Sequence, residues 1–354
     1  MIQVDGSLHS GSGTILRYAV ALATLLGEPL HMTRIRAKRE KPGLRPQHLQ
    51  AVRACCSLSG GKLEGAEVGS TEIFFKPGET LKAGDFHWDI GTAGSTTMLA
   101  FTLIPLALFA GSPCSFLMVG GLFQDFAPSA FHMQRVLLPT LKRMGAEIRM
   151  EVLRPGYPPK GEGRLRVEVK PLRGRLNPLR MTEQGAIKRI EGISLASHLE
   201  NERVSERMAD QSTRLLEKRG YRTHIEVLND QNALQKGAAL LLWAETETGC
   251  RVGSDQAGKP GRRSEKIAQF VATSLLQDLD TNATTDRHLA DQLILFAALA
   301  GGTSEYLIPR RTEHIESNIW LVEKILGVKS ELGKNHLRIE GIGFQGAEKE
   351  FRRD

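Results

Sequence analysis

Cysteine is scarce in this sequence, and long apolar segments are missing from it. The chain has only four cysteines, which are Cys55, Cys56, Cys114 and Cys250. None belongs to a C-x-x-C pair, so a zinc scaffold of paired cysteines is excluded, and we interpret them as reduced thiols in a cytoplasmic core. The most apolar segment, residues 98–110, is shorter than the roughly 20 residues that cross a bilayer. It predicts a buried helix.

The N-terminal residues MIQVDGSLHSG also lack the charged start and apolar run of a secretory signal, which favours the cytoplasm. Hydrophobic residues make up 41% of the 354 residues and charged residues 25%, which is typical of a globular protein. The formal net charge of +7 favours a polyanionic partner such as a nucleic acid or a nucleotide.

A repeated pattern runs through the sequence. The segment GEPLHMTRIR at residue 27 resembles GSPCSFLMVG at residue 111, and the same offset of 84 carries His48 onto His132. A third, shorter copy begins with the apolar run 289–300 and continues to His314. In each copy thirteen residues separate a histidine from a glycine, in the pairs His48–Gly61, His132–Gly145 and His314–Gly327. Each unit predicts an apolar helix, a strand, an amphipathic helix that ends at glycine, and a further strand.

These units predict an α/β fold in which three repeats pack into one large domain. The expected strands include residues 30–36, 72–75, 115–119, 147–153 and 165–169. About 100 additional residues lie between the second and third copies, and their alternating strand and helix patterns predict a smaller inserted α/β domain. We therefore expect residues 1–179 and 279–345 to form the repeat-built domain and residues 180–278 to form the insert.

Positive charge is concentrated in RIRAKREKPGLRPQHL, residues 34–49, which holds six lysines and arginines and a single acid. Guanidinium groups bind phosphate through two hydrogen bonds, and the helix expected to start near Gln47 adds a positive dipole end. The segment predicts either a phosphate-binding loop or a solvated basic loop, and the residues alone favour neither.

His314 is a candidate nucleophile. It follows Thr312, a favoured N-cap residue, so it should lie in the first turn of a helix with Asn318 on the same face. A neutral imidazole there can attack phosphorus while helix amides and arginines stabilise the developing charge. The alternative is a capping or core histidine, which the apparently equivalent His48 and His132 favour.

Weaker signals of phosphate chemistry lie elsewhere in the chain. Asp291 and Gln292 open an apolar helix, and a carboxylate there can hold Mg²⁺ beside a triphosphate, or can be an ordinary helix N-terminal acid. The glycine-rich segments GSLHSGSGT and GTAGSTT precede apolar helices and can cradle phosphate. Neither segment matches a Walker A or a Rossmann fingerprint.

Taken together, several segments resemble the motif series of the RNA 3'-terminal phosphate cyclases. They are RAKREKPGLRPQHL, EGAEVGSTEIFFKPG, GTAGSTT, GYPPKGEG, HLADQL and TEHIESNI. Their order and spacing match over nearly the whole chain, including the insert. The resemblance implies three similar α/β units plus an inserted domain.

The resemblance also implies a reaction and its partners. The family's motif histidine, here His314, attacks the α-phosphate of ATP, passes AMP to an RNA 3'-phosphate, and the 2'-hydroxyl then closes a 2',3'-cyclic phosphate. Mg²⁺ or Mn²⁺ is the implied metal. By motif position, the residues that contact ATP or phosphate are Arg17, Arg39, Gln47, Pro128, His288, Leu289, Ala290, Asp291 and Gln292.

The sequence departs from the family pattern at five positions. Ser10 replaces a glutamate that helps to hold the metal, Thr14 and Phe101 each replace a glutamine, His288 replaces a tyrosine that stacks on adenine, and Glu162 interrupts a triple glycine. The carboxylates that could compensate for Ser10 are those of Asp291, Glu313 and Glu316. The metal ligands and the base preference therefore stay open.

Two other functions compete with an active cyclase. One is a non-catalytic RNA-binding or ribosome-assembly factor on the same fold, which Ser10 and Phe101 favour and His314 opposes. The other is a nucleotidyltransferase that adenylylates a DNA 3'-phosphate or a 5'-phosphate end. The sequence does not indicate an oligomeric state.

Overall fold

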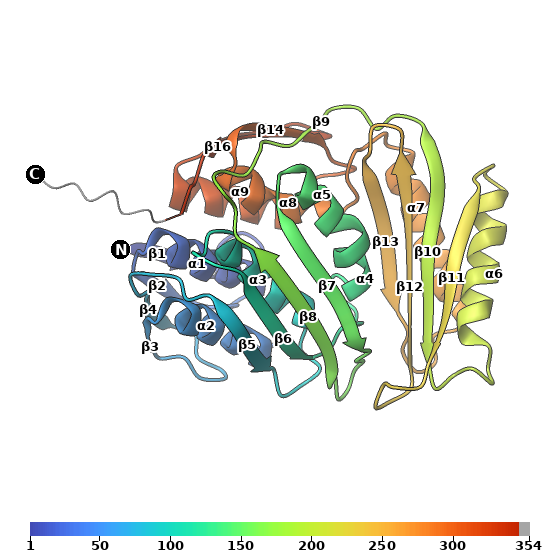
Figure 1. Ribbon diagram of the computed structural model, residues 1–354, viewed down its shortest axis with the longest axis horizontal. Coiled ribbons are helices and arrows are strands. Elements are labelled where there is room, and N and C mark those ends of the chain that lie inside the picture. The colour runs from blue at the N-terminus through green and yellow to red at the C-terminus, as the bar shows by residue number, and fades with distance from the viewer. Residues whose placement is uncertain (347–354) are drawn as a thin grey trace, which may run out of the picture.

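The computed structural model describes residues 1–346, and three units with one topology build its larger part (Figure 1). In each unit the first strand pairs in parallel with the second. The last strand pairs antiparallel with the second and also with the third. The predicted triple repeat is thereby confirmed.

The elements of the three units follow the chain. The first unit contains β1 (Ile2–Asp5), α1 (Gly13–Leu26), β2 (Leu30–Thr33), α2 (Pro46–Ser59), β3 (Lys62–Glu64) and β4 (Ile73–Lys76). The second contains β5 (Gly84–Asp89), α3 (Thr96–Leu108), β6 (Cys114–Gly120), α4 (Ala130–His132), η1 (Met133–Leu137), α5 (Leu138–Arg143), β7 (Glu147–Arg154) and β8 (Gly163–Lys170). The third contains β9 (Arg180–Met181), α8 (Leu289–Leu299), β14 (Gly301–Leu307), α9 (Glu313–Leu326), β15 (Lys329–Leu332) and β16 (His336–Ile342).

The insert forms a sheet of its own between β9 and α8. It consists of β10 (Ile187–Ser197), α6 (Val204–Glu217), β11 (Thr223–Asp230), β12 (Gly237–Thr246), β13 (Arg251–Ala257) and α7 (Ser264–Leu279), with strand order β11-β10-β12-β13. Arg180 and Met181, which the expected division assigns to the insert, pair with β14 of the third unit. The domain boundaries themselves stay a prediction.

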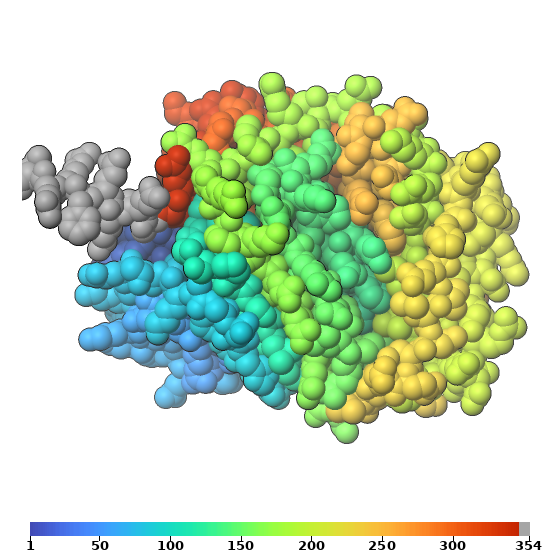
Figure 2. Space-filling model, in the orientation of Figure 1, coloured from blue at the N-terminus to red at the C-terminus, as the bar shows by residue number. Residues whose placement is uncertain are grey.

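Both faces of β12, a central strand of the insert's sheet, are buried. Leu240 and Leu242 of β12 point into a core beneath α6 and α7, while Leu241 and Trp243 join the core of the repeat units. This alternation follows from the two-residue period of a strand. Figure 2 shows the yellow and orange surface of the insert directly beside the green surface of the second unit.

The apolar first helices form the centre of the repeat units. The segment predicted to be a buried helix at 98–110 is α3, whose Leu99 and Leu103 are fully enclosed in the common core. Within residues 1–346 no helix is long and apolar enough to cross a membrane.

The structure corrects the register of the repeat by one residue. α2 ends at Gly60, which has a φ of 64°, rather than at Gly61, and α9 ends at Gly327 with a φ of 68°. When the helix ends are aligned, His314 corresponds to Gln47 rather than to His48. The alignment of the three histidines by their thirteen-residue spacing from a glycine is therefore wrong.

His48 and His132 do share a position, because both are the third residue of their helix. In the second copy the helical segment 130–143 is as long as α2, but it is followed by Met144, with a φ of −84°, and the left-handed glycine comes one residue later, at Gly145. His314 is the second residue of α9. His314 therefore does not share the position of His48 and His132, and their structural role does not extend to it.

Each unit meets the next at a corresponding place. The start of α2 contacts the loop before α3, where Oε1 of Gln47 accepts a hydrogen bond from the Ser95 amide at 2.8 Å. The end of α4 contacts the residues before α8, where His132 pairs with Asp286. The start of α9 contacts the loop before α1, where Ser317 bonds Ser10. This last junction contains His314.

Candidate active site

His314 lies in the first turn of α9. Thr312 caps the helix by accepting a hydrogen bond from the Ile315 amide at 3.2 Å, as the sequence predicts. The side chain of His314 is exposed. Four residues on, the buried Asn318 donates to the Tyr18 hydroxyl and to the Asp291 carbonyl, both at 3.2 Å. The junction of α1, α8 and α9 thus supports the turn that presents His314.

The surroundings of His314 keep its imidazole neutral. Partial desolvation lowers the pKa of His314, and the charge of Arg39 and the neighbouring His288 lower it further. Arg17 acts in the same direction, and Glu313 opposes them. A neutral ring has a free lone pair at ordinary pH, so the site favours a nucleophile.

Arg17 is a buried cation on α1. Its side chain is 5% exposed, its Nε has no hydrogen-bond partner in the part of the chain described, and burial with repulsion from Arg36 lowers its pKa to about 10. A buried guanidinium without a carboxylate partner is costly. An anion at this junction would offset that cost.

Two more unpartnered polar atoms lie on the neighbouring helices. Oε1 of Gln292 on α8 and Oδ1 of Asn318 on α9 are both buried without a hydrogen bond among residues 1–346. Buried polar atoms are satisfied in the great majority of cases. Together with Nε of Arg17, these atoms mark the junction of α1, α8 and α9 as a place for a polar ligand.

A chain of hydrogen bonds joins two of the predicted nucleotide contacts. Gln47 accepts from the Ser95 amide at 2.8 Å, and the Ser95 and Thr97 hydroxyls are 2.7 Å apart. Thr97 then donates to the carbonyl of Pro128 at 2.7 Å. The start of α2, the start of α3 and the loop before α4 are therefore held together beside one another.

Comparison with known proteins decides the family. A profile of the RNA 3'-terminal phosphate cyclase family matches residues 8–332. The chain belongs to that family. The RNA 3'-terminal phosphate cyclase of Pyrobaculum neutrophilum is 39% identical over 97% of this chain and 99% of its own. That of Pyrococcus furiosus is 39% identical over 96% of this chain and 98% of its own. An enolpyruvyl transferase structure from Streptomyces tendae covers 97% of this chain and 51% of its own at 11% identity, with a TM-score of 0.28.

The departures from the cyclase pattern have structural roles. Ser10 is 6% exposed, its amide donates to the Ser317 hydroxyl at 3.1 Å, and that hydroxyl donates to Oγ of Ser10 at 2.8 Å. Phe101 is a core residue, with its ring centroid 5.8 Å from those of Tyr18 and Phe296. Hydroxyl bonding and aromatic packing therefore occupy positions where other cyclases are expected to carry ligand-binding side chains.

The turn GYPPKGEG, for which the sequence indicates no purpose, packs against the loop before α3. A side chain at Gly161 would place its Cβ 2.7 Å from Cα of Ala93, so only glycine allows this approach. Glu162, which interrupts the family's triple glycine, adopts a φ of 52°, a conformation more typical of glycine.

Of the residues at the start of α8, some are accessible to a ligand and others belong to the hydrophobic core. His288 is exposed and Asp291 is partly exposed, whereas the side chains of Leu289 and Ala290 are fully buried in the hydrophobic core. Burial and the nearby Asp286 raise the pKa of Asp291 to about 7. Leu289 and Ala290 can therefore offer only backbone atoms to a ligand.

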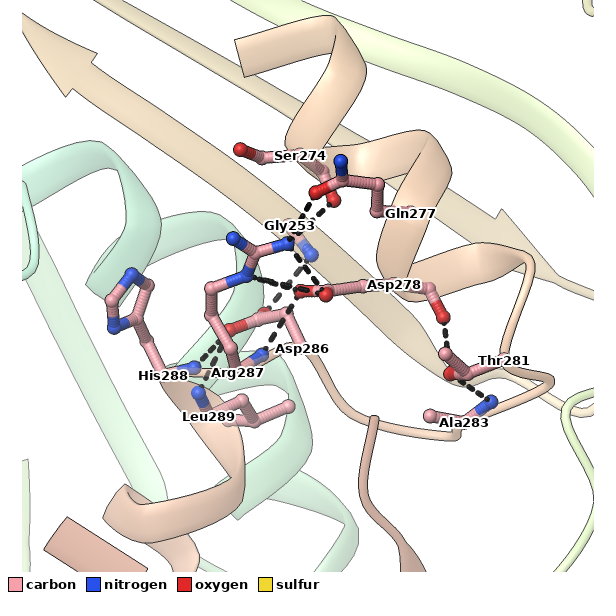
Figure 3. Close-up of polar contacts among 10 residues, drawn as sticks. All are labelled: Gly253, Ser274, Gln277, Asp278, Thr281, Ala283, Asp286, Arg287, His288 and Leu289. Atoms are coloured by element: carbon pink, nitrogen blue, oxygen red, sulfur yellow. Dashed lines mark hydrogen bonds and ion pairs between the residues drawn. The ribbon is translucent and has the colours of Figure 1, made fainter. Parts of the chain in front are cut away.

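The buried pair of Asp286 and His132 supports the site, and the sequence does not indicate this pairing. Oδ1 of Asp286 accepts from the amides of His288 and Leu289, both at 2.8 Å, and Oδ2 accepts from the Gly253 amide at 3.0 Å (Figure 3). The same Oδ2 lies 3.0 Å from Nε2 of His132. This carboxylate fixes the start of α8, where His288 and Asp291 lie.

Arg287 ties the same segment to the insert at a second point. Its guanidinium pairs with the buried Asp278 at the end of α7, with Nη2 2.7 Å from Oδ1 (Figure 3). His288 thus follows a residue tied to the insert. No local pattern could reveal these contacts, because His132 and Asp286 are 154 residues apart.

The described residues contain no ready-made metal cage. Within residues 1–346 no group of three histidine, cysteine, aspartate or glutamate side chains is arranged to hold an ion. Mg²⁺ usually keeps several waters and binds one or two carboxylates together with substrate phosphates. Asp291 fits that mode, whereas Ser10 offers only a hydroxyl.

Proposed function

We propose that this protein uses ATP to convert an RNA 3'-terminal phosphate into a 2',3'-cyclic phosphate, with His314 as the nucleophile. The observation that carries the proposal is the position of His314 at the start of α9, beside the positive charge of Arg39, with a lowered pKa. The unpartnered polar atoms of Arg17, Gln292 and Asn318 support a polar ligand in the same place.

The first step is transfer of AMP to the histidine. The lone pair of the neutral imidazole forms a nitrogen–phosphorus bond to the α-phosphate, and the bond from that phosphorus to pyrophosphate breaks. Arg39 and Arg17 stabilise the negative charge that develops, and the helix N-terminus adds its positive dipole end. Asn318, held by Tyr18 and the Asp291 carbonyl, keeps the first turns of α9 in place.

The second step transfers AMP to the RNA, and the third closes the cyclic phosphate. An oxygen of the RNA 3'-phosphate attacks the adenylyl phosphorus, and the histidine leaves as a neutral ring. The 2'-hydroxyl then attacks the activated 3'-phosphorus, loses its proton to solvent or a nearby base, and releases AMP. The product is the cyclic phosphate.

A divalent cation would be held by Asp291 together with phosphate oxygens of ATP, in the binding mode that Mg²⁺ prefers. Bound there, Mg²⁺ or Mn²⁺ supplies positive charge to the triphosphate. The exposed carboxylates of Glu313 and Glu316 at the start of α9 are the other oxygen donors proposed to compensate for Ser10.

The test is self-labelling with α-³²P-ATP in Mg²⁺ or Mn²⁺, followed by gel electrophoresis. We expect label on the wild type and none on His314→Asn. The matched control is His224→Asn, an exposed histidine on β11 of the insert. Addition of an RNA 3'-phosphate should remove the label and yield cyclic ends.

The other outcomes separate the competing functions. Absence of label with either metal would overturn the proposal and favour an RNA-binding or ribosome-assembly factor. Label that is removed only by a DNA 3'-phosphate or by a 5'-phosphate end would indicate nucleotidyl transfer to a different acceptor. Parallel reactions with end-labelled RNA and DNA distinguish these cases.

A further inference from the structure

Phe126 is a fully exposed aromatic residue in the loop between β6 and α4. Its exposure is 107% of the reference value for phenylalanine, and its backbone has a φ of 67°. Bulky side chains rarely adopt this conformation, and such outliers gather at functional sites. The loop also contains Pro128, one of the predicted nucleotide contacts.

The loop that carries Phe126 is tied to the insert on both sides of the ring. Asp125 makes a two-bond pair with Arg262, at 2.9 Å and 2.8 Å, and this hydrogen bonding lowers the pKa of Asp125. On the other side, the Ser129 amide donates to Oδ2 of Asp255 on β13 at 2.8 Å. Phe126 is therefore held out into solvent by a fixed loop.

A basic hollow lies beside this anchor, in the turn between β13 and α7. Its volume is about 550 Å³. Its lining residues are Lys259, Pro260, Gly261, Arg262, Arg263 and Lys266. Nζ of Lys259 lies 3.9 Å from Asp125, the residue next to Phe126. Arg262 serves the anchor, so the charges that remain for an anionic ligand are those of Lys259, Arg263 and Lys266.

One short strand, β13, joins the hollow to Asp286, the residue that fixes the start of α8. β13 contacts Asp286 through the Gly253 amide, and its last residue, Ala257, accepts a hydrogen bond from Arg262. Four residues of a strand span about 13 Å. A single strand of RNA whose 3' end lies near His288 would therefore reach Phe126 with its next nucleotides.

We propose that Phe126 and the basic hollow of 259–266 bind the last nucleotides of single-stranded RNA before its 3'-phosphate. This inference rests on the proposed function and gives the insert a role in it. The ring offers a stacking surface for a base, and Lys259, Arg263 and Lys266 face the backbone phosphates. An exposed aromatic beside a positive groove is how proteins bind single strands without reading sequence.

The experiment measures binding of a 5'-fluorescein oligoribonucleotide with a 3'-phosphate by fluorescence anisotropy, without ATP. Phe126→Ala should weaken binding about tenfold, the effect of losing one stacked base. Phe126→Trp should restore it. The matched control is Phe270→Ala, which removes a phenylalanine that is 48% exposed on α7.

Charge is tested in the same assay. Lys259→Ala combined with Lys266→Ala should weaken binding. The slope of the logarithm of the binding constant against the logarithm of the salt concentration should become less steep by about 0.7 for each RNA phosphate that the protein no longer neutralises. Lys334→Ala, an exposed lysine in the turn between β15 and β16, is the control and should leave the slope unchanged. Equal affinity of Phe126→Ala and wild type, within twofold, would overturn the proposal.

Self-labelling with α-³²P-ATP separates this proposal from the proposed function. Loss of label in Phe126→Ala would show that the ring stacks on ATP instead, and would also overturn the inference. Failure of the wild type to take up label would overturn the proposed cyclase reaction. The anisotropy result would still decide whether this surface binds RNA.

Discussion

Nε2 of His132 lies 3.0 Å from Oδ2 of Asp286, and neither side chain is exposed to solvent. The two residues join three parts of the molecule, because His132 belongs to the second unit, Asp286 precedes α8 of the third, and the same oxygen binds the Gly253 amide of the insert. Burial alone would lower the pKa of His132, but the attraction of Asp286 outweighs it and raises that pKa. The pair is therefore charged.

Breaking this pair should destabilise the protein strongly. His132→Ala or Asp286→Asn leaves one buried charge without its partner, so we expect the free energy of unfolding to fall by about 3–5 kcal/mol. Urea denaturation measures it. The control is His31→Ala, which breaks a more exposed contact with Glu72 at 2.6 Å and should cost about 0–1 kcal/mol. Similar losses of stability in all variants would contradict the expectation.

The same pair predicts how stability depends on pH. The pKa of His132 is higher in the folded state than its unfolded value of about 6.5, so its contribution is complete below that pH and is lost as pH rises through the raised pKa. The pKa of Asp286 is lowered, so its contribution is lost on acidification below about 3.9. His132→Gln should flatten the alkaline side of a plot of melting temperature against pH.

The sequence predicts the repeat well because the features that define it depend on residues close together in the chain. Apolar runs, helix-ending glycines and the cap at Thr312 all act within a few residues of one another. The predicted register is wrong by one residue because Gly60, not its neighbour Gly61, ends α2, and because Met144 precedes the left-handed Gly145 in the second copy. Two adjacent glycines cannot be told apart by spacing alone.

The parts of the site that the sequence does not reveal depend on distant contacts. β13, with the sequence RVGSDQA, has too few apolar residues to indicate a strand, although it carries Gly253 and Asp255 to the second unit. Phe101 stands out in the sequence only as a departure from a family pattern, whereas its place against Tyr18 and Phe296 is set by tertiary packing. Such contacts become visible only once the chain is folded.

The pH dependence of self-labelling should report on His314. Desolvation lowers its pKa and the charge of Arg39 lowers it further, so the neutral nucleophile should persist below pH 6.5, and labelling should decline only in more acidic buffer. Arg39→Gln removes one of the charges that lower the pKa of His314. The acidic limb of the plot of labelling rate against pH should therefore move toward higher pH. Arg53→Gln, an exposed arginine further along α2, is the control and should leave the limb in place.

The dependence on metal should report on Asp291. If its carboxylate holds Mg²⁺ with the triphosphate, Asp291→Asn should raise the Mg²⁺ concentration needed for half-maximal labelling by about 10–100-fold. Glu313→Gln and Glu316→Gln, assayed separately, show whether the start of α9 contributes a ligand. An unchanged requirement for metal in all three variants would exclude these residues as the replacement for the missing glutamate at Ser10.

Gly13 at the start of α1 packs directly against the ring of His48. A Cβ added at Gly13 would lie 2.1 Å from Nε2 of His48, whose pKa burial and the nearby cations lower to about 2. Gly13→Ala should therefore cost about 1–3 kcal/mol through overpacking, and this cost should shrink when His48→Ala is added.

The same variants separate structure from chemistry. His48 accepts a hydrogen bond from the Arg45 amide at 3.2 Å and is 3% exposed, so its ring serves the packing and capping at the start of α2. His48→Asn should lower the melting temperature while the folded fraction still takes up label from ATP, whereas His314→Asn should fold normally and take up none. If both variants kept their stability and lost label, the different helix positions of His48 and His314 would have no functional meaning.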